Sequence, residues 1–427
     1  MNDHLAIAQA HVDFLPAGER AGLLTRWAER LRRDQEGLAR AITTATAKPL
    51  RLARQEVERG VALLHATAEE LPRLAPRSVN LGDGGTAQWH RLPAGPVLAI
   101  TPFNFPLTLA LHKIAPALLA GCPVLWKPSP KAPGVAEAVF AHLQHAGLDA
   151  GVVQLLSATN AQVLAMAADP RLAVLSFTGS PAVGRALQAV ALRARVVLEL
   201  GGNAAAIIHR SQQSADVARR IAQAACANAG QVCISVQRIL IPANEPAWQR
   251  ELIKAFNDVP TGDAWADTTL CGPLIDDAAV QRVRDELDGA LARGGTILCG
   301  GTFSGSSGRT LAPTLIAGLP ASDPAVRNRE IFAPIAYLLP YATIDEALTI
   351  ADDTPFGLNA GIFTDDEAVI SAAFARIQVG TLVVNDVPTR RDDRLPYGGM
   401  KESGSGREGA LVALDTYLND RVLWRAG

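Results

Sequence analysis

Two short segments of this sequence each place one reactive side chain among small residues. Cys233 lies in Gly230-Gln-Val-Cys, and Glu199 precedes it by 34 residues in Glu-Leu-Gly-Gly. A thiolate is a nucleophile and a carboxylate a general base, while glycines allow backbone and substrate to approach both. Burying a carboxylate at the end of an apolar strand is costly unless the group has a role. We therefore predict an enzyme that attacks a carbonyl carbon with Cys233. The alternatives are a buried, inert cysteine and a carboxylate in a salt bridge.

A third candidate is Asn104, in Thr101-Pro-Phe-Asn-Phe-Pro106. Two prolines restrict the backbone on either side of it, so the amide is held in one place. A fixed N–H donor is what an oxyanion hole needs. The alternative is an asparagine that satisfies turn backbone.

Two further segments have nucleotide-binding chemistry. Gly179 and Ser180 lie where a predicted strand gives way to a helix, a position that offers backbone N–H groups and a hydroxyl to a phosphate. Lys127 and Ser129 end another predicted strand, where a lysine can bond ribose hydroxyls. The alternatives are a tight turn and a solvated lysine.

The elements that must position these residues alternate along the chain. Helices are expected within 17–72 and a hairpin at 78–91, around Asp83-Gly-Gly. Strands are then expected at 97–101, 124–127, 152–155, 173–177 and 196–200, and helices at 108–120, 135–146, 161–168 and 182–192. A second block has strands at 205–208 and 235–241 and helices at 216–229, 277–293, 344–351 and 367–377. This order predicts the α/β class, with two doubly wound parallel sheets and a cleft between them at strand carboxyl ends.

Composition excludes several other classes. Hydrophobic residues make up 48%, charged residues 19%, and the net charge is −2, which argues against nucleic acid or a membrane surface as partner. The apolar stretch 92–111 is broken by four prolines and therefore is not expected to span a membrane. Five cysteines without paired spacing indicate reduced thiols rather than disulfides or a metal site. With no evident signal peptide, we expect a cytoplasmic protein.

Together with Glu330-Ile-Phe-Ala-Pro and Pro396-Tyr-Gly-Gly-Met-Lys-Glu-Ser-Gly, these motifs resemble the NAD(P)-dependent aldehyde dehydrogenase superfamily, of the non-acylating type. The resemblance runs in order from about residue 40 to the end. It implies Cys233 as nucleophile, Glu199 as general base, and Asn104 with the Cys233 N–H as oxyanion hole. It also implies a set of residues that bind NAD or NADP: Thr101, Pro102, Lys127, Ser129, Gly179, Ser180, Gly201, Glu330 and Phe332.

The resemblance also implies three parts of the molecule. Residues 1–75 and 92–202 would form the dinucleotide-binding domain, and 203–410 the catalytic domain. Residues 76–91 and 411–427 would form an oligomerisation arm, so a homodimer or homotetramer is expected. Many NAD-specific members carry a Glu shortly after the lysine position, where this chain has Ser129-Pro-Lys131. The choice between NAD and NADP stays open.

For the substrate, Leu109 and His112 are expected along the entry tunnel, one to two helical turns beyond Asn104. The segment from Asp386 to Arg391 resembles the loop of members that act on short polar or anionic aldehydes, so Arg390 or Arg391 could pair with an anionic tail. Two alternatives remain: a CoA-acylating semialdehyde dehydrogenase and a catalytically silent binding relative.

Overall fold

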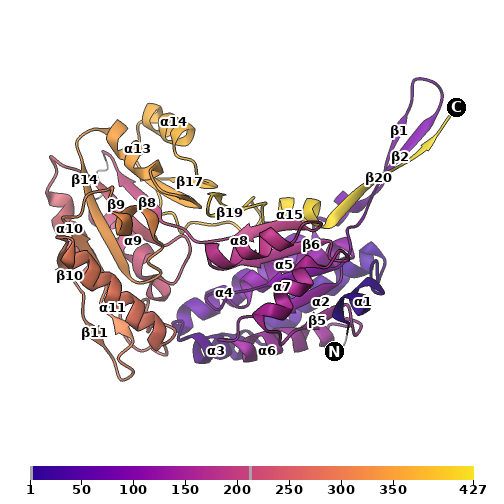
Figure 1. The fold of residues 1–427 in the computed structure, drawn as a ribbon, viewed down its shortest axis with the longest axis horizontal. Helices are drawn as coiled ribbons and strands as arrows, with labels where there is room; N and C mark the ends of the chain where they lie inside the picture. The colour runs from indigo at the N-terminus through magenta and orange to yellow at the C-terminus, as the bar shows by residue number, and fades with distance from the viewer. Residues whose placement is uncertain (1–2, 211–213) are drawn as a thin grey trace.

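The computed structural model describes residues 3–210 and 214–427 as two α/β lobes and a projecting β arm (Figure 1). The α/β class predicted from the sequence is confirmed. No helix in the described ranges is both long and apolar enough to cross a membrane.

The first lobe contains a six-stranded sheet in the order β19-β7-β6-β3-β4-β5. Its strands are β3 (Val97–Ile100), β4 (Val124–Lys127), β5 (Val153–Leu155), β6 (Val174–Thr178), β7 (Arg195–Glu199) and β19 (Gly404–Ser405). The first five are parallel, as predicted, and their strongly apolar sequences match a sheet covered on both faces. β19 was not predicted; it pairs antiparallel with β7 and brings a segment from near the C-terminus beside Glu199.

Helices cover both faces of this sheet (Figure 1). They are α1 (His4–Gln9), α2 (Ala17–Arg33), α3 (Gln35–Thr46), α4 (Leu50–Ala68), α5 (Thr108–Ala120), α6 (Pro133–His145), α7 (Asn160–Ala168), α8 (Pro181–Val190) and α15 (Ala410–Tyr417), with a 3-10 turn η1 (Leu71–Leu74). Every residue of α5 is buried, because α2, α4 and α15 pack around it. The strand and helix positions expected between 97 and 200 agree with these bounds within about two residues.

The second lobe is built on a seven-stranded sheet in the order β10-β13-β14-β9-β8-β16-β17. Its strands are β8 (Ala204–Ile208), β9 (Val236–Pro242), β10 (Thr296–Cys299), β13 (Thr314–Ala317), β14 (Ile335–Tyr341), β16 (Asn359–Phe363) and β17 (Thr381–Val384). Only β10 runs antiparallel among these pairings, so the sheet is mixed.

The helices of this lobe are α9 (Ser214–Cys226), α10 (Ala247–Asn257), α11 (Asp277–Ala292), α12 (Pro324–Asn328), α13 (Ile344–Asp352) and α14 (Glu367–Arg376). A 3-10 turn η2 (Ala227–Gly230) and the short strands β11 (Phe303–Ser304), β12 (Thr310–Leu311), β15 (Phe356–Gly357) and β18 (Met400–Lys401) complete it. Both strands predicted for this block, and its helices, are present. No element was predicted for residues 296–341, where β10, β13 and β14 lie.

The arm consists of β1 (Arg77–Asn80), β2 (Thr86–Pro93) and β20 (Leu418–Arg425). β1 and β2 form the hairpin that Asp83-Gly-Gly predicted. β20 pairs antiparallel with β2 from Thr86↔Arg425 to Pro93↔Leu418. Figure 1 shows the arm projecting from the first lobe with the C-terminus at its tip. Within the segment 411–427, residues up to Tyr417 belong to α15 and pack in the core of the first lobe.

Candidate active site

The two motifs around Glu199 and Cys233 are in direct contact. Glu199 is the last residue of β7, and Gly202 follows it toward β8. A Cβ atom on Gly202 would lie 2.1 Å from the carbonyl oxygen of Cys233, so only glycine fits. The small residues that marked both segments in the sequence therefore allow the nucleophile and the carboxylate to share one site.

A tight turn delivers Cys233 to this contact. Asn228 and Ala229 in η2 both adopt φ of 55°, in the left-handed region, and Gly230 follows with φ of 65°. A Cβ on Gly230 would lie 2.1 Å from the carbonyl oxygen of Ala333. Two non-glycine residues in this conformation store backbone strain, which is typical of a functional site.

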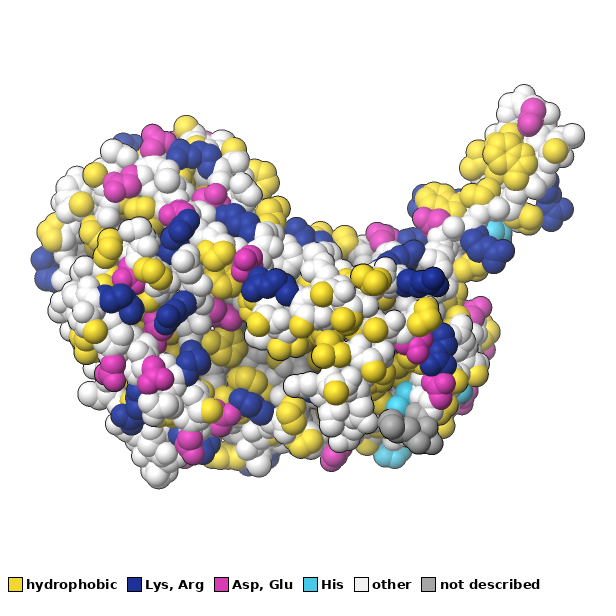
Figure 2. Space-filling view, viewed as in Figure 1, with side chains coloured by type: hydrophobic (Ala, Val, Ile, Leu, Met, Phe, Trp, Pro, Cys, Tyr) yellow, Lys and Arg dark blue, Asp and Glu magenta, His cyan; other side chains and the backbone are white. Residues whose placement is uncertain are grey.

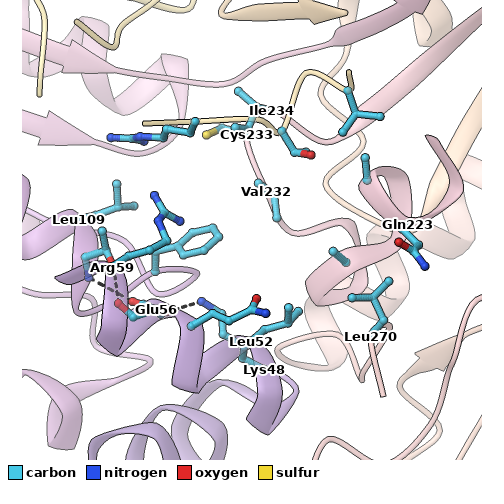
Figure 3. A pocket seen from close by; sticks show the side chains of 18 of the residues that line it. Lys48, Leu52, Glu56, Arg59, Leu109, Gln223, Val232, Cys233, Ile234 and Leu270 are labelled. Atoms are coloured by element: carbon cyan, nitrogen blue, oxygen red, sulfur yellow. Dashed lines mark hydrogen bonds and ion pairs between the residues drawn. The ribbon is translucent and has the colours of Figure 1, made fainter. Parts of the chain in front are cut away.

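Cys233 opens into a cavity of about 340 Å³ between the two lobes (Figure 3). One wall comes from α4 and the residues before it, and the facing wall from α9, with Cys233 between them. The residues that line the cavity include Lys48, Leu52, Glu56, Arg59, Phe105, Leu109, Arg220, Gln223, Val232, Cys233, Ile234, Leu270, Arg391 and Tyr397. The space suits a small-molecule substrate.

The surroundings of Cys233 keep its sulfur protonated at rest. Burial raises the pKa of the thiol to about 12, while the Tyr397 hydroxyl, 3.5 Å from Sγ, lowers it. Charge on Glu330 and on Glu199 adds to the rise, and Arg391 opposes it. An attacking thiolate must therefore form against its surroundings.

Glu199 is 2% exposed, and neither carboxyl oxygen has a hydrogen-bond partner among the described residues. Burial raises the pKa of this carboxyl well above its usual range, and the carboxylate of Glu408 raises it further. Arg391 and Lys113 act in the opposite direction. Glu199 does not itself line the cavity, but in its ionised form an unpartnered carboxylate can take a proton from water, which is the chemistry of a general base.

Asn104 is hydrogen-bonded to the backbone two residues before Cys233. Its side-chain Nδ2 donates to the carbonyl oxygen of Gln231 at 3.0 Å, and the residue is buried. An amide nitrogen has two N–H groups, so one remains for another acceptor. The structure thus brings together all three residues for which the sequence predicted catalysis.

The predicted nucleotide-binding residues lie along one edge of the six-stranded sheet. In its parallel register Ile100 pairs with both Lys127 and Phe177, so the segments that follow β3, β4 and β6 emerge side by side. These segments carry Thr101, Pro102, Lys127, Ser129, Gly179 and Ser180. The hydroxyl of Thr101 accepts a hydrogen bond from the Trp126 indole N–H at 3.0 Å.

Ser180 is the N-cap of α8, and its side chain makes no capping bond. Its hydroxyl and the first-turn N–H groups of α8 are thus placed for a phosphate. Burial lowers the pKa of the half-buried Lys127.

Glu330, which was also predicted to bind the nucleotide, lies in the second lobe and contacts the segment that follows β7. Its Oε1 accepts from the Gly202 N–H at 3.1 Å, and a Cβ on Gly201 would lie 2.7 Å from its Oε2. Burial raises the pKa of Glu330 to about 7. Phe332 adopts φ of 53°, and its ring meets that of Phe103 edge to face at a centroid distance of 6.2 Å. Amides, hydroxyls and a lysine at one sheet edge, with a carboxylate from the second lobe, are groups that fit a nicotinamide dinucleotide.

Lys131 is engaged elsewhere. Its Nζ lies 2.6 Å from a carboxylate oxygen of Asp276 in the second lobe and 5.1 Å from the centroid of the Phe103 ring. It therefore ties the lobes together at this point, and attraction of a 2′-phosphate would require it to leave Asp276.

Two of the four predicted substrate residues do not line the cavity. His112 lies behind the wall, fully buried, with Nε2 2.8 Å from Arg391 and 3.1 Å from Asp393. The prediction that it lines the tunnel is wrong, because it projects from a face of α5 that is covered. Arg390 points to solvent with 75% of its side chain exposed, so it is also misplaced. Leu109 and Arg391 do line the cavity.

Sequence reasoning missed several lining residues with polar chemistry, among them Lys48, Glu56, Arg59, Arg220 and Tyr397. Tyr397 lies within the glycine-rich motif that begins at Pro396, but no role was predicted for it. Lys48 and Glu56 form a fully buried ion pair at the base of the cavity (Figure 3). The only sequence signal for this pair was a lysine and a glutamate on the apolar side of predicted helices, which tertiary packing alone distinguishes from surface charges.

Comparison with known proteins gives a consistent answer. Residues 4–423 match the Aldehyde dehydrogenase family. A 3-sulfolactaldehyde dehydrogenase of Priestia aryabhattai is 34% identical over 412 residues, which cover 95% of this chain and 86% of that protein. A sulfoacetaldehyde dehydrogenase of Neptuniibacter caesariensis is 32% identical and covers 93% of this chain and 88% of that protein. Aldehyde dehydrogenase 21 from Physcomitrella patens, solved in complex with the reaction product succinate, matches with a TM-score of 0.94 and 31% identity, covering 100% of this chain and 90% of that one. The resemblance found in the sequence is confirmed: the chain belongs to the aldehyde dehydrogenase family.

Proposed function

We propose that this enzyme oxidises a short anionic aldehyde to its carboxylic acid with NAD+ or NADP+, through a covalent adduct on Cys233. The observation that carries the proposal is the meeting of a cavity-facing thiol, an unpartnered buried carboxyl and a fixed amide at Cys233, Glu199 and Asn104.

The geometry supports one role for each of these residues. The thiolate of Cys233 adds to the carbonyl carbon, and the free N–H of Asn104 with the backbone N–H of Cys233 stabilises the oxyanion. Lys127, Ser180 and Glu330 would hold NAD(P)+, which would supply the hydride acceptor for that carbon; solved family members hold NAD+ or NADP. Glu199 then takes a proton from water, which attacks the thioester and releases the acid.

Hydrolysis is favoured over transfer to CoA because Glu199 is present and none of the described residues hydrogen-bonds its carboxyl oxygens. A carboxyl without hydrogen bonds can bind and deprotonate water, a role that thiol transfer does not need. The presence of Cys233, Glu199 and Asn104 in one site also argues against a silent binding relative.

The charge of the cavity supports an anionic substrate. Its lining contains four cations, Lys48, Arg59, Arg220 and Arg391, and a single carboxylate, Glu56. Arg59 donates two hydrogen bonds, of 2.9 and 3.0 Å, to the carboxylate of Asp393. The guanidinium group of Arg220 lies 2.7 Å from the carboxylate of Asp386. Arg391 also lies 2.7 Å from Asp393, so two guanidinium groups share this one carboxylate, and the positive charge left there favours a sulfonate or carboxylate tail. Relatives that act on 3-sulfolactaldehyde and sulfoacetaldehyde support the same class.

The remaining assignments are also proposals. We assign 1–75 and 92–202 to cofactor binding, 203–410 to catalysis, and 76–91 with 411–427 to oligomerisation. The exposed arm supports a homodimer or homotetramer, and five free cysteines support the cytoplasm.

Initial rates with sulfoacetaldehyde, succinic semialdehyde and an uncharged aldehyde of similar size, each with NAD+ and NADP+, test the proposal. We expect the anionic aldehydes to give the higher kcat/KM and free acid as product. Equal or better rates with the uncharged aldehyde would contradict the substrate class, and an acyl-CoA product would contradict hydrolysis. Absence of turnover with every aldehyde, or oxidation retained by Cys233→Ala, would contradict the reaction.

A further inference from the structure

Tyr397 lies between a cation and the candidate nucleophile. The guanidinium carbon of Arg391 is 3.6 Å from the centroid of the Tyr397 ring, and the Tyr397 hydroxyl is 3.5 Å from Sγ of Cys233. All three residues line the same cavity. Within the described ranges, that hydroxyl is the one side-chain group with a hydrogen bond to Sγ.

The direction of this hydrogen bond follows from the charges. A thiolate has no proton and can only accept. Burial and the neighbouring Cys233 raise the pKa of Tyr397 well above its usual range, so the phenol keeps its proton. The phenol O–H is therefore the donor of the hydrogen bond to Sγ. Arg391 over the ring face draws electron density from the phenol and strengthens it as a donor.

Arg391 is itself held in place. Its Nε lies 2.7 Å from Asp393, and its terminal nitrogen lies 2.8 Å from Nε2 of His112. Asp393 in turn accepts two hydrogen bonds from Arg59. The buried His112 that sequence reasoning placed in the tunnel therefore belongs to the support of this arginine.

Other charged groups around the sulfur act against ionisation. Glu199 at the end of β7 and Glu330 ahead of β14 both disfavour a thiolate, as does burial. Tyr397 and Arg391, from the segment between β17 and β18, are the two groups that favour it.

We propose that Tyr397, supported by Arg391, donates the hydrogen bond that orients Sγ of Cys233 and stabilises its thiolate. The proton lost by the thiol goes to solvent base; Tyr397 keeps its own. Arg391 is then a positioning residue for the nucleophile. This inference rests on the proposed role of Cys233 as nucleophile.

The test is the pH profile of alkylation of Cys233 by iodoacetamide in the full-length enzyme, followed at this residue by peptide mass spectrometry. Tyr397→Phe removes the hydroxyl and keeps the ring. Because a hydrogen bond to a charged group is lost, we expect the profile to move up by about one pH unit or more. On the rising limb, alkylation slows only about threefold per unit, since a more basic thiolate is the better nucleophile.

Tyr341→Phe is the matched control, because it also removes a buried hydroxyl, which donates to the carbonyl oxygen of Ile208 at 2.7 Å in the second lobe. Its profile should coincide with that of the native enzyme. Arg391→Met should produce a smaller upward shift with the hydroxyl intact, and Arg391→Lys should restore part of it. If Tyr397→Phe does not fold, the profiles of the two Arg391 variants test the proposal in its place.

Profiles of Tyr397→Phe and native enzyme that superimpose would overturn the inference, as would an equal shift in Tyr341→Phe. The proposed function is judged separately, by aldehyde oxidation in the native enzyme and its loss in Cys233→Ala. Failure of oxidation with a displaced Tyr397→Phe profile would reject the function and retain the hydrogen bond.

Discussion

Asn104 connects the proposed oxyanion site to the proposed nucleophile through one side chain. Its amide bonds the backbone two residues before Cys233 and retains a second N–H for the substrate. Substitution therefore removes a transition-state donor and loosens the turn that presents the thiol. The prolines on either side explain why the sequence alone could single it out.

Asn104→Ala should lower kcat by roughly 10²- to 10³-fold, because an oxyanion-hole donor acts mainly in the transition state. The measurement is steady-state turnover at saturating NAD(P)+ and aldehyde. A raised KM with kcat unchanged would instead mean that the amide binds the ground state and the transition state equally.

Glu199 makes stability depend on pH in a direction opposite to most acids. Its folded pKa is raised, by burial first. Below its ordinary pKa the carboxyl is protonated in both folded and unfolded chains and costs the fold nothing. As the pH rises from there through the folded pKa, the unfolded chain ionises more readily and stability is lost.

Glu199→Gln should therefore gain stability relative to the native enzyme as the pH rises, while hydrolysis of the acyl-enzyme is lost. Thermal unfolding of both proteins between about pH 5 and pH 9 measures this, as the change in Tm difference. A Tm difference independent of pH would show that the carboxyl ionises as easily in the fold as outside it.

The sequence could single out candidate residues where the motif itself shapes the local backbone. Cys233, Glu199 and Asn104 stand in short motifs whose glycines and prolines are themselves part of the geometry. His112 was misplaced because the face that a helix residue presents depends on partners distant in sequence, here Asp393. Arg390 was misplaced because it lies on an exposed loop, where its one ion-pair partner, Asp386, is only four residues away.

At the scale of elements, the contact between α4 and α5 holds the Asn104 loop. Oε1 of Glu56 accepts from the backbone N–H groups of Leu107 and Thr108 at 2.9 and 3.2 Å, where α5 begins. Its other oxygen pairs with Lys48, whose Nζ lies 3.7 Å from the centroid of the Phe105 ring. Burial lowers the pKa of Lys48, so that this amine depends on its partner to stay charged.

Glu56→Gln should destabilise the fold by about 3–5 kcal/mol, since it leaves a buried ammonium without a counter-charge. Adding Lys48→Met should recover most of that loss, because glutamine still offers an oxygen to the α5 amides. Urea denaturation of the three proteins gives the free energies. A single variant within about 0.5 kcal/mol of native would mean that Lys48 readily becomes neutral.

Most helices and parallel strands could be predicted because their apolar periodicity is local. The parallel register that aligns Lys127 with Phe177 across β3 follows from that alternation. The pairing of β19 with β7 could not be predicted, because it joins residues about 200 positions apart through two short segments with no strand pattern.

At the scale of the molecule, the sheets determine where chemistry can occur. The carboxyl ends of the strands in the first sheet face residues from the second lobe. Two contacts join the lobes there, the ion pair Lys131–Asp276 and the ring contact Phe103–Phe332. The α/β class was predictable from element order. The mixed direction of the second sheet was not, because the residues of β10 and β13 show no clear alternation.

The projecting arm leaves apolar surface that a monomer does not bury. Trp89, Val422 and Trp424 share one face, because Trp89 pairs with Val422 and alternate strand residues point the same way. Trp424 is 61% exposed, and Figure 2 shows hydrophobic side chains gathered at the arm. β20 also presents an unpaired strand edge.

Replacing Val422 and Trp424 together by Glu should convert the proposed oligomer to a smaller species, since two charges would enter the proposed apolar contact. Sedimentation velocity at fixed protein concentration measures the change. Phe374→Glu is the control, because this exposed phenylalanine lies on α14 in the other lobe, and it should leave the mass unchanged. The arm has its own sheet, so each variant should retain the Tm of the lobes. A double variant with native mass would show that subunits associate through another surface and that the apolar face of the arm has a different partner.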